Sequence, residues 1–134
     1  MNILLDTHIA LWSIADSNKL SSKANELIAS KDNEIYYSIV SVWELAIKHF
    51  LKPDFMTMSE EDFVDYCNKL EYIQLQIKNN HIFNIKSLIR NTNQPKHNDP
   101  FDRLLLSQAK SENLVLLTHD SLLLGYNEPC VMIV

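Results

Sequence analysis

The feature that most constrains the fold is a regular alternation of short apolar or aromatic runs with segments of helical periodicity. The short runs predict strands at residues 2–5, 34–38, 72–77, 114–117 and 131–134. The segments between them predict helices at residues 7–15, 23–30, 41–52, 59–70, 80–90, 100–112 and 120–124. Short apolar strands that alternate with helices are typical of a mostly parallel sheet covered on both faces. We therefore expect an α/β protein.

The length of 134 residues predicts a single domain that spans residues 1–134. No apolar run approaches the ~18 residues that a membrane-spanning helix needs, and no basic segment precedes Asp6, so we expect neither a membrane segment nor a secretory signal. Cys67 and Cys130 lie far apart and form no CxxC pair. These observations predict a cytoplasmic protein with reduced thiols.

Glycine is scarce, since Gly125 is the only one in the chain. Glycine-rich phosphate loops and dinucleotide fingerprints need several glycines, so enzymes that use those motifs are excluded. The net charge of −5 argues against a protein that coats nucleic-acid phosphates along its whole surface. The bases are nevertheless concentrated in residues 78–110, where we expect Lys96 and Arg103 to contact phosphates. For Arg103 the alternative is an ion pair with Asp99 or Asp102.

Residues 99–102 have the sequence pattern of a helix start. Asp99 suits the N-cap position and Pro100 the first helical position, while Asp102 lies in the first turn, where the helix dipole favours an anion. This stretch alone is explained by a well-capped amphipathic helix. The positions of other acids in the chain indicate a further role for the acids of this stretch.

Four acids stand out because each lies in or beside apolar sequence at the start of a helix or the end of a strand. They are Asp6, Glu44, Asp102 and Asp120. Because ligands bind outside the carboxyl ends of parallel strands, we expect these acids to converge there. Converging carboxylates need a cation, and oxygen ligands suit Mg²⁺ or Mn²⁺. Taken singly, Asp6 and Asp120 are also explained as helix caps, and Glu44 as an ion-pair partner of Lys48.

Two further expectations concern histidines and the helix at residues 41–52. His97 and His119 are predicted at the rim of the acidic site. Ser41 is predicted as the N-cap of the helix, whose buried face is predicted from the helical spacing of Trp43, Ala46, Ile47 and Phe50.

Four segments, taken in order, resemble the PIN-domain ribonucleases, and within them the VapC-type toxins of prokaryotic toxin–antitoxin pairs. They read LLDTH at residues 4–8, SIVSVWEL at 38–45, HNDPFDRLL at 97–105 and LLTHD at 116–120. The resemblance covers nearly the whole chain. It implies a PIN-like α/β/α sandwich, Mg²⁺- or Mn²⁺-dependent endoribonuclease activity, a cognate antitoxin protein as partner and a homodimer.

The resemblance also maps the catalytic, metal-binding acids onto Asp6, Glu44, Asp102 and Asp120. It leaves Asp99 as either a helix cap or a member of the site, and we expect Asp99, Thr118 and Ser41 to support the four acids. Two alternatives stay open. One is a catalytically silent PIN-fold interaction module, and the other is a nuclease that acts on DNA or in RNA processing.

Overall fold

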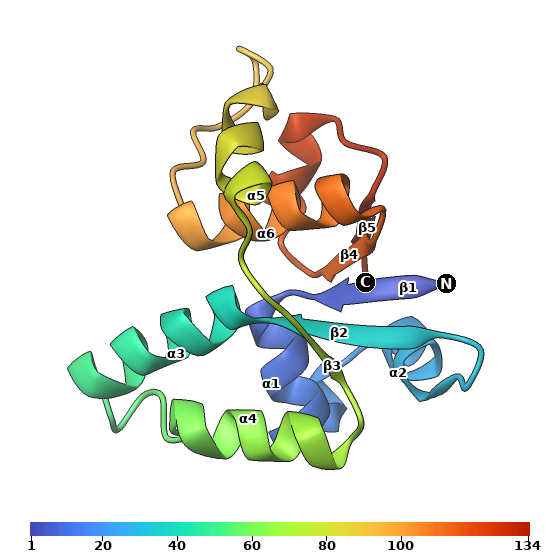
Figure 1. Ribbon diagram of the computed structural model, residues 1–134, viewed down its shortest axis with the longest axis vertical. Helices are drawn as coiled ribbons and strands as arrows, with labels where there is room; N and C mark the ends of the chain where they lie inside the picture. Colours follow the sequence, from blue (N-terminus) through green and yellow to red (C-terminus); the bar gives the residue numbers. More distant parts are fainter.

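The computed structural model describes residues 1–134 and contains one five-stranded sheet in which every neighbouring pair of strands is parallel. The strand order is β3-β2-β1-β4-β5 (Figure 1). The strands are β1 (Asn2–Leu5), β2 (Glu34–Ser38), β3 (Ile73–Leu75), β4 (Val115–Thr118) and β5 (Val131–Ile133). The predicted parallel sheet is confirmed.

Strand β1 lies in the middle of the sheet because its inner residues are apolar on both faces. Ile3, Leu4 and Leu5 have no exposed surface. Leu4 pairs with Tyr36 of β2 and with Leu116 of β4. Since side chains alternate along a strand, Leu4 joins the core on one face, while Ile3 and Leu5 join the core on the other. Burial on both sides explains why this strand reads as a continuous apolar run.

Helices cover both faces of the sheet, with α1, α2 and α4 on one side and α5 and α6 on the other (Figure 1). The α-helices are α1 (Thr7–Ala15), α2 (Ser22–Ala29), α3 (Ile39–Leu51), α4 (Glu60–Lys69), α5 (Asn79–Phe83) and α6 (Pro100–Glu112). Three short 3-10 helices are η1 (Ser17–Lys19), η2 (Asn84–Ser87) and η3 (Ser121–Tyr126). The predicted α/β/α sandwich is confirmed. None of the helices combines the length and the apolar character that a bilayer crossing requires.

Two helix predictions were wrong in detail. The N-cap of α3 is Ser38, whose hydroxyl accepts from the backbone N–H of Val40, so Ser41 lies inside the helix. The helix predicted at residues 80–90 divides into α5 and the 3-10 turn η2. In this turn the Ser87 hydroxyl donates to the Asn84 carbonyl, a local side-chain bond of the kind that competes with helix continuation.

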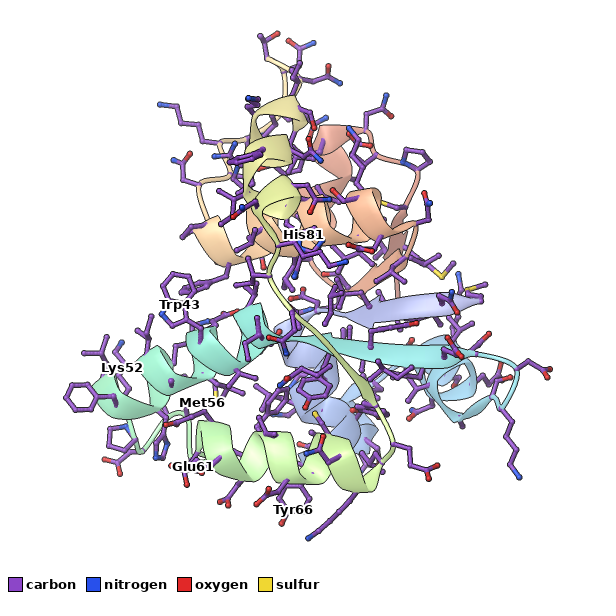
Figure 2. The ribbon with its side chains drawn as sticks, in the orientation of Figure 1. Trp43, Lys52, Met56, Glu61, Tyr66 and His81 are labelled. Atoms are coloured by element: carbon purple, nitrogen blue, oxygen red, sulfur yellow. The ribbon has the colours of Figure 1, made fainter.

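The predicted buried face of α3 was also wrong. The side chains of Trp43 and Phe50 are 53% and 84% exposed, whereas Val40 and Leu45 fill the cores. Figure 2 shows Trp43 on the side of α3 nearest to α6, and its ring lies edge-on to Phe101 with the centroids 4.9 Å apart. The inward face of α3 also carries polar residues, which a search for apolar periodicity passes over.

Candidate metal centre

Asp6 stands at the carboxyl end of β1, where the central strand turns into α1. Its side chain is the N-cap of α1, because Oδ1 accepts from the backbone N–H of Thr7 at 2.7 Å. Its other oxygen, Oδ2, accepts from the Thr118 hydroxyl at 2.6 Å. The residue is only 5% exposed. Asp6 is therefore a helix cap and is also held rigidly at the sheet edge.

Glu44 projects from the second turn of α3 and is buried. Its Oε1 accepts from the Thr7 hydroxyl at 2.8 Å, and that hydroxyl lies 2.8 Å from Oγ of Ser41. Its Oε2 forms an ion pair with Lys48, one helical turn later. The predicted pairing with Lys48 is therefore present, and it coexists with a hydrogen bond that joins Glu44 to the start of α1. Ser41 supports this arrangement from inside α3.

The two aspartates at the start of α6 have different partners. Asp99 is the N-cap, since its Oδ1 accepts from the backbone N–H groups of Phe101 and Asp102 at 2.9 and 3.1 Å. The Asp102 carboxylate caps nothing, and its one polar partner is His97, whose Nε2 lies 3.2 Å from Oδ2. Oδ1 of Asp102 makes no hydrogen bond. The cap role is thus taken by Asp99, and Asp102 remains free to bind a ligand.

Asp120 follows β4 and caps the 3-10 helix η3, where its Oδ1 accepts from the backbone N–H of Leu122 at 3.0 Å. Its own backbone N–H donates to the Thr118 hydroxyl at 3.0 Å. Thr118 therefore contacts both Asp6 and the backbone of Asp120. Thr118 thus lies between two of the four acids.

All four predicted acids line one cavity of about 300 Å³ that has no hydrophobic residue in its wall. The complete lining is Asp6, His8, Glu44, Lys48, Asp99, Asp102, His119, Asp120 and Ser121. His119 lies at this cavity as predicted, with its ring packed against Trp12. His8 and Lys48 were not predicted as lining residues, because an exposed histidine and a lysine in an ion pair have no sequence signature of a site.

The crowding of carboxylates changes their acidity. Burial, and after it the negative charges of neighbouring acids such as Asp6 and Asp99, together raise the pKa of Asp102 from its usual 3.8 to about 8. Burial also raises the pKa of Asp6, although the hydrogen bonds from Thr118 and Thr7 oppose that rise. Groups that resist ionisation in this way are stabilised as carboxylates by a bound cation.

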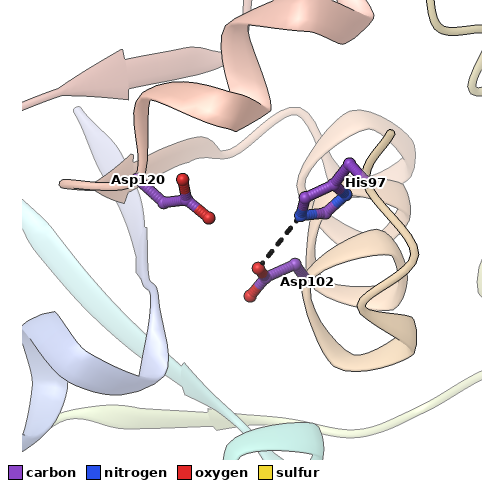
Figure 3. A group of neighbouring side chains, drawn as sticks. All are labelled: His97, Asp102 and Asp120. Carbon is purple, nitrogen blue, oxygen red and sulfur yellow. Dashed lines mark hydrogen bonds and ion pairs between the residues drawn. The ribbon is translucent and has the colours of Figure 1, made fainter. Parts of the chain in front are cut away.

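His97 was predicted at the rim, and the structure corrects this position. Its side chain is 4% exposed and lies beside Asp102, inside the wall of the site. Figure 3 shows the ring of His97 directed toward Asp102, with Asp120 on the other side of the same space. One ligand atom from each of these residues lies within 4.8 Å of the other two. His97 comes from an aperiodic loop, so no hydrophobic pattern could predict its burial.

Arg103 and Lys96, the predicted phosphate contacts, do not line the acidic cavity. They line a second cavity of about 240 Å³ together with Leu88, Arg90, His97, Asn98 and Tyr126. Arg103 forms no ion pair with Asp99 or Asp102, and its buried Nε has no hydrogen-bond partner. His97 lines this basic cavity and also contacts Asp102, so the basic and acidic cavities are neighbours.

The side chains of the acidic cavity fit a hard divalent cation. Such ions take oxygen ligands, and Asp102 and Asp120 each keep a carboxylate oxygen without a hydrogen-bond partner beside the buried carboxylates of Asp6 and Glu44. Asp6 and Glu44 are oriented by hydroxyl groups, as metal-binding carboxylates commonly are.

The chain is similar to known proteins in sequence and in structure. The protein-family model described as PIN domain matches residues 3–126. No curated protein sequence gives a significant match. Among solved structures, a chain of VapBC2 from Rickettsia felis, bound to a DNA fragment from its promoter, is similar with a TM-score of 0.62 and 18% identity, over 100% of this chain and 98% of that one.

A second similar structure is a domain of a functionally unknown protein from Methanocaldococcus jannaschii. Its TM-score is 0.60 at 15% identity, and the match covers 99% of this chain and 90% of that domain. At these identities the two structures show a shared fold. The family model spans most of the chain and includes the segments that carry all four acids, and this chain therefore belongs to the PIN domain family.

Proposed function

We propose that this protein is a divalent-metal-dependent endoribonuclease that hydrolyses RNA phosphodiester bonds, and that it is the toxin of a type II toxin–antitoxin pair. The observation that carries the proposal is the convergence of Asp6, Glu44, Asp102 and Asp120 on one hydrophilic cavity. Helix capping and ion pairing do not account for all of them, because Asp102 is buried with three other acids nearby and caps nothing.

In this proposal the four acids hold Mg²⁺ or Mn²⁺. A bound ion of this kind activates water and stabilises the charge that develops during phosphoryl displacement. The chain itself supplies the positioning. Thr118 and Thr7 orient the two oxygens of Asp6, and the Thr7 hydroxyl also orients Glu44. Lys48 balances the charge on the second Glu44 oxygen and fixes that side chain along α3.

The basic cavity beside the site supports an RNA substrate. A buried guanidinium nitrogen without a partner costs free energy, and a phosphate oxygen would supply the missing acceptor. Arg103 has such a nitrogen, and no acid lines its cavity. We assign Arg103 and Lys96 to the phosphate that lies next to the one being cleaved.

The toxin role is supported by family membership and by the similarity to a chain of VapBC2, which is described as bound to promoter DNA. In this role the protein forms a homodimer and pairs with a cognate antitoxin. A cavity lined by carboxylates invites an antitoxin segment with arginine or lysine. Binding of that segment would occlude the site, so the nuclease activity should fall when the complex forms.

The test is cleavage of a fluorescent single-stranded RNA and of the DNA of the same sequence, with Mn²⁺ and with a chelator. Wild type should cleave RNA only with the metal, and Asp6→Asn or Asp102→Asn should lose at least ~100-fold in rate, which corresponds to about 2.7 kcal/mol of transition-state stabilisation. Asp65→Asn on α4, an exposed acid far from the site in sequence, is the matched control and should cleave normally.

Three results would contradict the proposal. Cleavage that persists in the chelator would reject the metal. Absence of any cleavage by wild type on a panel of RNAs, together with no Mn²⁺ binding in calorimetry, would leave the fold as an interaction module. Faster cleavage of DNA than of RNA would reject the substrate class.

A further inference from the structure

We infer that His97 is a nitrogen ligand of the metal, bound through Nε2 alongside Asp102 and Asp120, and that Tyr126 holds the imidazole in the tautomer this requires. The inference rests on the proposed metal site and adds a donor that the set of four acids does not contain. It also predicts which ion the protein prefers.

The His97 ring is held firmly in the fold. The His97 side chain is almost fully buried, and its ring lies edge-on to that of Tyr126, with centroids 5.4 Å apart and planes at 86°. Nδ1 lies 2.7 Å from the Tyr126 hydroxyl oxygen. Both ring nitrogens therefore have defined neighbours, one on each side. These contacts hold the ring in one orientation, with Nε2 directed at Asp102.

Two hydrogen-bonding atoms lie near the Tyr126 hydroxyl, the backbone carbonyl oxygen and Nδ1 of His97. The Tyr126 hydroxyl donates its single proton to the backbone carbonyl of His97 at 3.3 Å. Ligation through Nε2 requires the ring proton of neutral His97 on Nδ1, where the Tyr126 oxygen, 2.7 Å away, can accept it. Nε2 is left with a lone pair, and it points at Oδ2 of Asp102, 3.2 Å away. A cation beside Nε2 and Oδ2 would take both atoms as ligands.

Three potential ligand atoms lie close together beside the ring. Nε2 of His97 and carboxylate oxygens of Asp102 and Asp120 lie within 4.8 Å of one another (Figure 3). An ion that binds nitrogen and oxygen at about 2.0–2.2 Å places opposite ligands about 4.2 Å apart, so small side-chain movements seat it among these three atoms. A ligating histidine whose second nitrogen donates to a neighbouring oxygen is the usual arrangement in metal sites, and Tyr126 provides that oxygen.

A nitrogen ligand has a consequence for ion choice. Imidazole binds first-row transition ions better than it binds Mg²⁺, which prefers oxygen throughout. His97 should therefore make the site favour Mn²⁺ over Mg²⁺. Replacement by glutamine, which offers an amide oxygen or nitrogen in place of imidazole, should lower Mn²⁺ affinity about tenfold or more and Mg²⁺ affinity much less.

Pulsed EPR of the Mn²⁺-loaded, full-length protein tests this inference directly, because a directly bonded imidazole nitrogen gives a characteristic coupling to the manganese electron spin. Wild type should show it, and His97→Gln should lose it while still binding Mn²⁺. His8→Gln and His119→Gln are the matched controls, since both residues line the cavity, and they should retain the coupling.

A second measurement does not depend on the glutamine variant. Nitrogen NMR of ¹⁵N-histidine-labelled, metal-free wild type should place the His97 proton on Nδ1. Tyr126→Phe, which keeps the ring but removes the hydroxyl, should lose that single tautomer, weaken Mn²⁺ binding and retain the EPR coupling.

Mn²⁺ bound without nitrogen coupling, or coupling that survives in His97→Gln, would overturn ligation by His97 and leave the acidic site standing. A wild-type proton on Nε2 would overturn the role assigned to Tyr126. A role limited to positioning Asp102 would give Mn²⁺ binding without coupling. If calorimetry detects no Mn²⁺ binding to wild type, both this inference and the proposed metal site fail.

Discussion

The Thr118 hydroxyl donates to Oδ2 of Asp6 at 2.6 Å, and this bond joins two residues that are 112 positions apart in the chain. It crosses from the end of β4 to the end of β1, two strands that pair directly. The same hydroxyl accepts from the backbone N–H of Asp120. One side chain thus sets the positions of the first and the last of the four acids.

We predict that Thr118→Val lowers the free energy of unfolding by about 1–3 kcal/mol, because it keeps the shape but leaves a buried Asp6 oxygen and the Asp120 N–H without partners. Mn²⁺ affinity should fall about tenfold or more, as for other lost supports of metal ligands. Urea unfolding and calorimetry measure the two effects. Thr118→Ser keeps the hydroxyl, and a serine variant as impaired as the valine variant would contradict the assignment.

The positions of Asp6, Asp102 and Asp120 could be predicted because simple rules act on them. Two follow buried parallel strands, whose carboxyl ends meet at one edge, and one lies in the first turn of a helix that begins with Asp99 and Pro100. These rules depend on neighbours in sequence and on the strand order of a parallel sheet. The elements that carry these acids were accordingly predicted to within a residue or so.

The environment of His97 could not be predicted, because it depends on contacts between distant parts of the chain. Tyr126 and Asp102 surround the ring, and Arg90 holds the preceding loop through the carbonyl of Pro95. The prediction that Trp43 is buried was wrong for a related reason. The buried face of α3 is decided by polar contacts of Glu44, and a search for apolar periodicity does not detect them.

Arg103→Ala should weaken RNA binding and reduce the salt slope of the logarithm of the binding constant by about 1, because one phosphate contact is lost. It should cost little stability, since Arg103 makes no ion pair and its buried Nε has no partner. Binding is measured by fluorescence anisotropy at several salt concentrations on the Asp6→Asn background, which does not cleave. Lys110→Ala, which removes a lysine paired with Glu128, is the control. An unchanged slope for Arg103→Ala would exclude the phosphate contact.

Gly125→Ala should lower the stability of the protein by disturbing the residues packed around His97 and Tyr126. A Cβ at this position would lie 2.5 Å from Nη1 of Arg90, which donates to the carbonyl of Leu122 and lies over the Tyr126 ring. The guanidinium must move, and because it is the far end of a flexible side chain, the cost is the loss of its hydrogen bonds to Leu122 and Pro95, about 0.5–1.5 kcal/mol each. Thermal melts of Gly125→Ala, Arg90→Ala and the double variant give the interaction free energy between the two positions. If the destabilisations of the two single variants add in the double variant, the absence of a side chain at Gly125 does not serve to make room for Arg90.

Asp102→Asn should change how stability depends on pH in the metal-free protein. The folded protein keeps the Asp102 proton up to a pKa of about 8, whereas the unfolded chain releases it near the usual 3.8. The unfolded state therefore binds fewer protons between about pH 4 and pH 8, and the free energy of unfolding falls as pH rises through that window. Asparagine carries no proton to lose, so the variant should become progressively more stable relative to wild type as pH rises.

The measurement is a set of urea unfolding curves for both proteins at pH 5.5, 7 and 8.5 with a chelator, repeated at pH 7 with Mn²⁺. At 100 times its Kd the ion should stabilise wild type by about 2.7 kcal/mol, and it should stabilise Asp102→Asn much less, because a ligand is missing. The opposing effect is the lost favourable interaction of ionised Asp102 with the α6 dipole, which is worth at most about 1 kcal/mol and is present mainly above the pKa of about 8. A difference between the two proteins that stays constant with pH, together with no response of either to Mn²⁺, would reduce the acids to helix caps and surface charges and would remove the basis of the ribonuclease proposal.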